Sequence, residues 1–153
     1  MSSDDDLFLK TDLSLDEVAE AMARVLSGHV QETRIPGQPC VSIDQVGDYT
    51  GWVTIFLRYR EDYLNDLHTI EWGSRIHAAI FYSKKLDEAQ QAIARILTRE
   101  LVEHVTWPAI LVHDSAWVLA AYDPEHGYRE FPAGQVLFTD PYARLWLGPD
   151  PSQ

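Results

Sequence analysis

Two segments of this chain have the apolar spacing of a helix, and strand-like segments outnumber them. The first helix is predicted at about 15–27, where Ser14 and Glu17 form a capping box at its start and Gly28 follows its end. The second is predicted at 86–105, which carries an apolar stripe at helical spacing. Two helices can cover only one face of a sheet of this size, so the other face is expected to be open.

The remaining regular segments have the patterns of strands. The strongest are 52–60 and 75–82, which are rich in β-branched and aromatic residues. Weaker strands are expected at 7–10, at 41–46, and at 109–113 and 117–122, the last two joined as a hairpin. This order of elements predicts an α+β fold, in which an antiparallel-rich sheet has the two main helices packed on one face.

The chain is expected to form a single domain over residues 1–153. No internal repeat or linker divides it, and its acidic start (1–6) and its C-terminal end (148–153) are predicted to be flexible. No apolar run approaches the roughly 20 residues that span a bilayer, and the acidic start is unlike a secretory signal. Cys40 is the only cysteine, which excludes an internal disulfide and fits the reducing cytoplasm.

The charge of the chain limits the classes of partner that it can bind. It has 24 acidic residues against 12 basic ones, a net charge of −12. Residues 1–50 hold ten acids and three bases, and residues 86–153 hold ten acids and four bases, whereas residues 51–85 hold four acids and five bases. The excess of acids argues against nucleic acid and anionic membrane as partners, and it fits a protein that docks on a basic surface.

The sheet face that the helices leave open combines aromatic and arginine side chains. The residues predicted to alternate onto it are Trp52, Phe56, Arg58, Arg60, Arg75, His77 and Phe81. Aromatic residues and arginine are enriched where proteins bind proteins. The sequence therefore predicts a partner-binding surface on this face. Two alternatives stay open: the C-terminal segment covers the face, with Trp146 and Leu147 filling it, or a homo-oligomer buries the same face against itself.

No motif in the chain indicates an active site or a metal centre. Cys40 has no base near it in sequence, and Glu100 with His104 supply only half of a metal site at helical spacing. His113 and Asp114 have the composition of an acid–base pair, but neighbours on a strand point to opposite faces, so a turn is predicted there. The sequence assigns no catalytic, cofactor-binding or metal-binding residue and favours a non-enzymatic protein.

An enzyme or a small-ligand-binding domain is the main alternative to a protein-binding role. In that case we expect a pocket between the sheet and the C-terminal segment, lined by Trp52, His77, Tyr82 and Trp117. Polar groups that converge in such a pocket would favour this alternative, and a solid core without a pocket would exclude it.

The start of the chain resembles a known family. Leu7-Phe8-Leu9 runs into Thr11-Asp12-Leu13-Ser14-Leu15-Asp16-Glu17-Val18. This stretch resembles the small immunity proteins of bacterial polymorphic toxin systems, and it is most similar to the Sit-type immunity family, where a short strand leads into a T-D-L-S-x-E-E-V-like helix start. The match covers about residues 1–25. The resemblance implies a cytoplasmic, non-enzymatic protein that binds and neutralises one cognate toxin, and it carries over no site residues, because such families diverge at the binding surface.

An acidic partner would suit a toxin of this kind. Many toxins act on nucleic acid and present basic clefts, so acids on the immunity protein raise the encounter rate and the complementarity of the two surfaces. The acids expected to contact a basic toxin lie near the predicted helices and loops: Asp16, Glu20, Asp44, Asp48, Asp123 and Glu125. We therefore expect an affinity that falls as the salt concentration rises.

Overall fold

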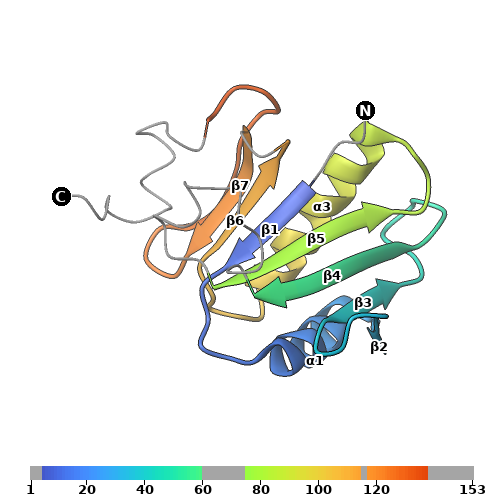
Figure 1. The fold of residues 1–153 in the computed structure, drawn as a ribbon. Coiled ribbons are helices and arrows are strands. Elements are labelled where there is room, and N and C mark those ends of the chain that lie inside the picture. Colours follow the sequence, from blue (N-terminus) through green and yellow to red (C-terminus); the bar gives the residue numbers. More distant parts are fainter. Residues whose placement is uncertain (1–4, 60–74, 115–116, 138–153) are drawn as a thin grey trace.

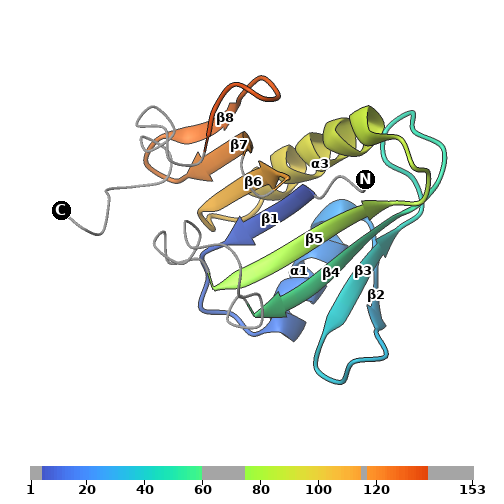
Figure 2. The same ribbon diagram turned by 45° about the horizontal axis from the view of Figure 1, so that its top comes forward.

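The computed structural model describes residues 5–59, 75–114 and 117–137. Over these residues, eight strands form one antiparallel sheet in the order β2-β3-β4-β5-β1-β6-β7-β8, and the two helices lie on the same face of it (Figures 1 and 2). The predicted α+β fold, with both main helices on one face of an antiparallel-rich sheet, is confirmed.

The bounds of the elements are as follows. The helices are α1 (Leu15–Leu26) and α3 (Asp87–Val102). The strands are β1 (Asp5–Leu9), β2 (His29–Glu32), β3 (Pro39–Ile43), β4 (Val53–Tyr59), β5 (Ile76–Tyr82), β6 (Ala109–His113), β7 (Trp117–Asp123) and β8 (Gly127–Glu130).

The first helix begins where its capping signal predicts. The Ser14 hydroxyl accepts a hydrogen bond from the backbone N–H of Glu17, and the Glu17 carboxylate accepts one from the backbone N–H of Ser14, both at 3.2 Å. These two bonds satisfy donors that have no partner within the helix. The helix ends at Ser27, which adopts the left-handed conformation with φ 55°. Gly28, the residue predicted to end the helix, is the next one along.

Several strands differ from their predicted bounds. β4 and β5 match the two strongest predicted strands to within one residue, because their β-branched and aromatic composition is a local signal. β2 and β8 lie in segments with no strand prediction, since both are short edge strands and all four residues of β2 are exposed. An edge strand forms through backbone hydrogen bonds to its neighbour, and these bonds require no alternation of apolar side chains. The sequence of such a strand therefore carries no strand pattern.

The main core lies between the sheet and the helices. α1 packs on β3 and β4, and α3 packs across β1, β5, β6 and β7. A second, smaller apolar cluster lies on the opposite face around the ring of Phe8. Its other members are Ile110, Val112, Val118, Ala121, Phe131 and Val136. β1 is therefore buried on both of its faces, and it is the strand that connects the two cores.

The predicted flexible start is wrong at Asp5 and Asp6. Both residues belong to β1, and they are only 1% and 5% exposed. The reason is tertiary, because β1 pairs with β5 on one side and β6 on the other, and both neighbours offer a histidine to a carboxylate. Residues 1–4 and 148–153 lie outside the described residues. Neither described helix is long and apolar enough to cross a membrane.

Candidate functional site

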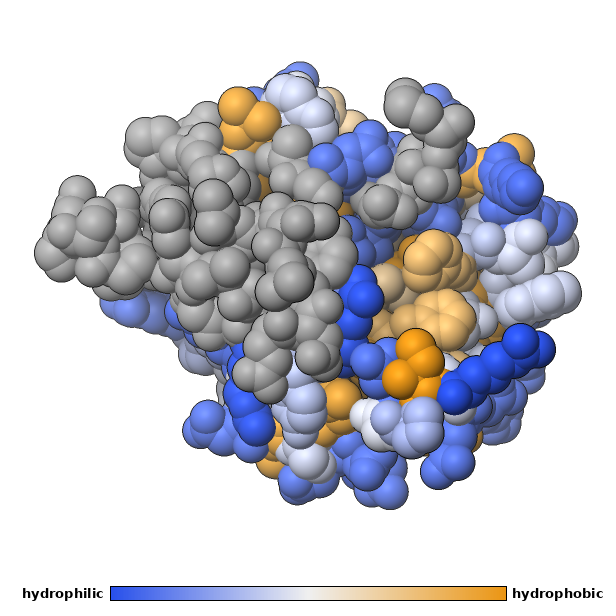
Figure 3. All heavy atoms as spheres, in the orientation of Figure 1, coloured by the Kyte–Doolittle hydropathy of each residue, from blue (hydrophilic) through white to orange (hydrophobic). Residues whose placement is uncertain are grey.

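An exposed aromatic surface lies on the face of the sheet that the helices leave open. The rings of Phe56 on β4 and Phe81 on β5 are 5.5 Å apart and meet edge to face, and these residues are 42% and 46% exposed. Trp52 lies on the same face two positions before Thr54, the residue paired with Phe81, and is 61% exposed. Figure 3 shows apolar side chains gathered on this side among hydrophilic ones.

The loop before β3 extends this surface. Ile35, which is 57% exposed, shares a cavity wall with Phe56. We use the name aromatic surface for the four residues Trp52, Phe56, Phe81 and Ile35. Large apolar side chains that gather at one exposed place commonly mark an interaction site. The sequence predicts three of the four members, because they alternate along strong strands. It does not predict Ile35, since the loop reaches Phe56 only in the folded chain.

The predicted contact residue His77 is buried instead of exposed. It is 1% exposed, its ring stacks on Phe8 at 5.0 Å, and its Nε2 lies 2.7 Å from Oδ1 of Asp6. Arg58, which is half-buried, donates from Nε to Nδ1 of His77 at 2.9 Å. Because arginine can only donate, Nδ1 must accept, so Nε2 carries the proton and donates to Asp6. The predicted exposure of His77 is wrong, because Phe8 and the second core cover this part of the open face.

Arg75 is exposed but does not belong to the aromatic surface. Its Nη1 donates to the backbone carbonyl of Leu13 at 3.1 Å, and its guanidinium lies 5.2 Å from the centre of the Tyr59 ring. Tyr59 in turn packs against the main core. The prediction that Arg75 joins this surface is therefore wrong, because Arg75 precedes β5 and turns toward the start of α1. Arg60 lies outside the described residues.

The predicted acidic contacts do not form one surface. Asp16 and Glu20 are exposed on α1, on the opposite side of the sheet from the aromatic surface. Asp44 and Asp48 are exposed in the connection from β3 to β4. Asp123 ends β7 and Glu125 lies in the turn that follows it, at the other end of the sheet (Figure 2). The Asp123 carboxylate accepts the backbone N–H groups of Glu125 and His126 at 2.8 and 2.7 Å, so it stabilises that turn.

The residues proposed to line an enzyme pocket are not brought together. Tyr82 belongs to the main core beneath the helices, whereas His77 lies on the other face of the same strand. Trp52 precedes β4, and Trp117 begins β7, four strands away. Both ring nitrogens of His77 are also in hydrogen bonds, so neither nitrogen can act on a substrate. The C-terminal segment of that pocket, at 138–153, lies outside the described residues.

Two other candidates for chemistry, Cys40 and His104, have structural surroundings instead. Cys40 is buried, and burial raises the pKa of its thiol, which disfavours the reactive thiolate. His104 places Nδ1 3.0 Å from the backbone carbonyl of Glu100, at the end of α3. Over the described ranges, no three or more His, Cys, Asp or Glu side chains are grouped to hold a metal ion.

The side chains of His113 and Asp114 lie close together instead of on opposite faces of a strand. Nε2 of His113 lies 3.3 Å from Oδ2 of Asp114. The two residues do not continue one strand, because Asp114 adopts a left-handed conformation with φ 52° just after β6. The predicted turn at this position is confirmed.

A buried carboxylate network on β1 is not predicted from the sequence. Asp5 accepts from Nε2 of Gln90 on α3 at 2.7 Å, and its Oδ1 lies 2.9 Å from Nδ1 of His113 on β6. Burial raises the pKa of the Asp5 carboxyl above its ordinary value of 3.8, and this effect outweighs the hydrogen bonds from Gln90 and His113, which lower it. One pattern in the sequence could have indicated this network. The apolar strands β5 and β6 each carry one histidine, and a buried histidine needs a hydrogen-bond partner.

Asp5→Asn is expected to flatten the pH dependence of stability. In the folded wild type Asp5 holds its proton above pH 3.8, where the unfolded chain has released it, so stability falls as the pH rises from 3.8 through the raised pKa. The variant lacks this fall, so its free energy of unfolding should rise relative to wild type across that window. Urea unfolding at several pH values measures this difference. The exposed Asp12→Asn is the control and should follow wild type; parallel curves for Asp5→Asn and wild type would contradict the account.

Comparison of the whole chain with protein-family models, with curated proteins and with solved structures finds no match in any of the three, so the proposal below depends on the geometry of the aromatic surface and on the N-terminal resemblance.

Proposed function

We propose that this chain is a protein-binding domain of the immunity type, which acts in the bacterial cytoplasm and neutralises a cognate toxin by direct contact. The single observation that carries the proposal is the exposed edge-to-face pair of Phe56 and Phe81, flanked by Trp52 and Ile35. Rigid aromatic side chains supply large contact area at low cost in conformational entropy, so they are frequent at the centres of protein interfaces. The toxin as partner is supported by the resemblance of residues 7–18.

The chemistry of the described residues favours binding over catalysis. His77, which lies on the same strand face as Phe81, is buried with both ring nitrogens in hydrogen bonds, and the only cysteine is buried as well. An enzyme needs a nucleophile or an acid–base group that can reach its substrate. The aromatic surface offers apolar contact instead, which is what an inhibitory partner requires.

The charge of the chain makes a second contribution to binding in the proposed complex. The net charge of −12 attracts a basic toxin over a distance, although the acids are spread over several sides of the fold. Such charges raise the association rate more than they lengthen the lifetime of the complex. We therefore place the short-range contacts on the aromatic surface and assign long-range attraction to the acids on α1 and in the loops.

Co-expression with the product of the neighbouring reading frame, which the proposal predicts to be the toxin, tests the proposal. We expect bacteria that make the toxin to grow only when this chain is also made, and we expect the two purified proteins to form a complex whose association slows as salt is added. Toxicity that persists in the presence of this chain, together with no complex, would overturn the proposal.

Self-association is the competing use of the same surface. A homo-oligomer would also bury Phe56 and Phe81, but the repulsion between two copies of a chain with a net charge of −12 opposes it. Light scattering of the isolated chain separates the two cases. A monomer is expected, and a dimer that the substitution Phe81→Thr dissociates would favour the homo-oligomer.

A further inference from the structure

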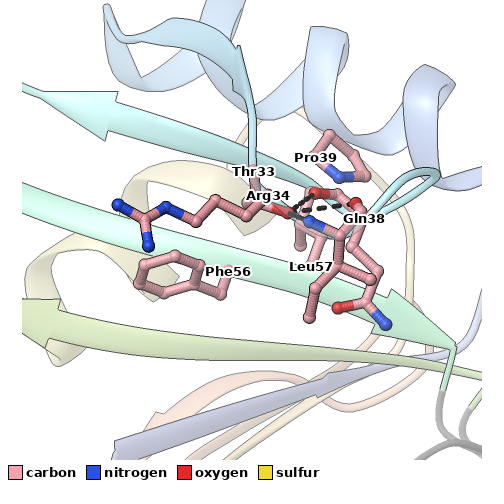
Figure 4. Close-up of a pocket in the computed structure, with 7 residues that line it drawn as sticks. Thr33, Arg34, Gln38, Pro39, Phe56 and Leu57 are labelled. Atoms are coloured by element: carbon pink, nitrogen blue, oxygen red, sulfur yellow. Dashed lines mark hydrogen bonds between the residues drawn. The ribbon is translucent and has the colours of Figure 1, made fainter.

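A cavity lies at the end of the aromatic surface, between the loop at 33–38 and strand β4 (Figure 4). Its volume is about 280 Å³, and its walls come from Thr33, Arg34, Ile35, Gln38, Pro39, Phe56 and Leu57. Four of these seven residues are apolar, and Phe56 is shared with the exposed aromatic pair. The cavity therefore continues the proposed docking surface, and its size suits one large side chain.

The loop that forms one wall is held by its own hydrogen bonds. The Thr33 hydroxyl lies 2.7 Å from the backbone carbonyl of Gln38, to which it donates, and it accepts from the backbone N–H of Ile35 at 3.2 Å. The backbone N–H of Gln38 donates to the carbonyl of Ile35 at 3.2 Å, which closes a turn around Pro36 and Gly37. Gly37 has φ +80°, the value that the third position of a type II turn requires. The wall is thus formed before a ligand arrives, which reduces the entropy lost on binding.

Arg34 provides a cation beside this cavity. Its side chain is exposed, and Figure 4 shows it extending from the loop along the same side of β4 as the Phe56 ring. Within the described part of the chain, its guanidinium has no hydrogen-bond or ion-pair partner, although Glu32 is only two residues away. A guanidinium next to an apolar cavity is matched by a carboxylate next to an apolar side chain.

We propose that this cavity receives an apolar side chain of the protein partner, and that a carboxylate next to that side chain in the partner pairs with Arg34. The inference rests on the proposed function, since it names the chemistry of one contact within that interface. It also divides the interface by charge: the partner is basic where it faces the acids of this chain, and acidic where it meets Arg34. Charge complementarity of this local kind fixes the orientation of a complex.

Two capped peptides of matched size test the inference without the toxin. Acetyl-Glu-Phe-Glu-amide offers an apolar side chain between carboxylates, and acetyl-Lys-Phe-Lys-amide offers the same side chain between cations. Each is titrated into the ¹⁵N-labelled full chain to about 10 mM, because contacts of this size bind with millimolar affinity. We expect the acidic peptide to shift the amide signals of Ile35, Gln38 and Leu57, and to bind about tenfold more tightly than the basic one.

Arg34→Gln is expected to remove the preference for the acidic peptide, while leaving the rest of the spectrum unchanged. Arg24→Gln, which removes an exposed arginine at the end of α1, is the matched control and should retain the preference. The inference is overturned by shifts that lie elsewhere, by equal binding of the two peptides, or by no shift at the highest concentration. If the peptides fail but the chain still neutralises the toxin, this inference falls alone; if the toxin does not bind but the acidic peptide does, the proposed function falls instead.

Discussion

Replacing Phe56 and Phe81 together with threonine is expected to weaken binding of the proposed toxin partner by about 100-fold, which corresponds to roughly 3 kcal/mol. The centres of the two rings are 5.5 Å apart and both residues are nearly half exposed. The free protein therefore loses little folding stability when the rings are removed. The complex, in contrast, loses the apolar area that both rings would bury. Threonine is chosen because it keeps the preference of both positions for a strand.

Isothermal titration of the purified proteins measures this loss. The matched control is Val30→Thr, which removes an exposed apolar side chain of similar exposure, 43%, from the edge strand β2. Val30 pairs with Val41, whose side chain belongs to the main core, so it lies on the helix side of the sheet. The control should bind the toxin as wild type does. Wild-type affinity of the double variant, with an unchanged far-ultraviolet spectrum, would rule out the aromatic surface as the docking site.

Asp6→Ala is expected to lower the free energy of unfolding by about 3–5 kcal/mol. Asp6 and His77 are 5% and 1% exposed and meet at 2.7 Å, and Arg58 donates to the other nitrogen of the same ring. Removing the carboxylate leaves the Nε2 proton of His77 buried without this acceptor, and it leaves the charge of Arg58 without the anion at the other end of the network. A buried donor that loses its partner keeps the whole cost of its desolvation.

Asp6→Asn separates the hydrogen bond from the charge. The amide oxygen of asparagine can still accept from Nε2 of His77, so this variant should lose about 1–2 kcal/mol, clearly less than Asp6→Ala. Urea unfolding at neutral pH measures both values. The hydrogen bonds of His77 also predict its tautomer. In ¹⁵N NMR of the ring, the proton should be found on Nε2 and not on Nδ1. A loss below about 1 kcal/mol for Asp6→Ala would contradict the role assigned to this network.

Local signals in the sequence predict much of the fold. The capping box at Ser14 and Glu17 determines the start of α1, and the alternation along β4 and β5 places Phe56 and Phe81 on the open face. Each of these signals lies within one element and depends on few distant contacts. Because such local signals identify most of the helices and strands, their order along the chain is enough to predict the α+β class.

The errors arise where distant parts of the chain meet. Asp5 and Asp6 have the composition of an exposed acidic end, and only the position of β1 between β5 and β6 buries them against two histidines. His77 has the pattern of an exposed position, but Phe8 from β1 covers it. The cavity beside Phe56 likewise depends on a turn that reaches β4 across β3. Strand order decides each of these cases, and no local pattern in the sequence reports that order.

Site-specific photo-crosslinking tests the central proposal, that the aromatic surface contacts the proposed toxin partner, most directly. A benzophenone amino acid replaces Phe81 on the aromatic surface in one variant and Asp16 on α1 in another, and each variant is irradiated with the toxin. The account predicts a strong crosslink from position 81 and none above background from position 16. A crosslink from position 16 with none from position 81 would place the toxin on the helix side of the sheet and contradict the account.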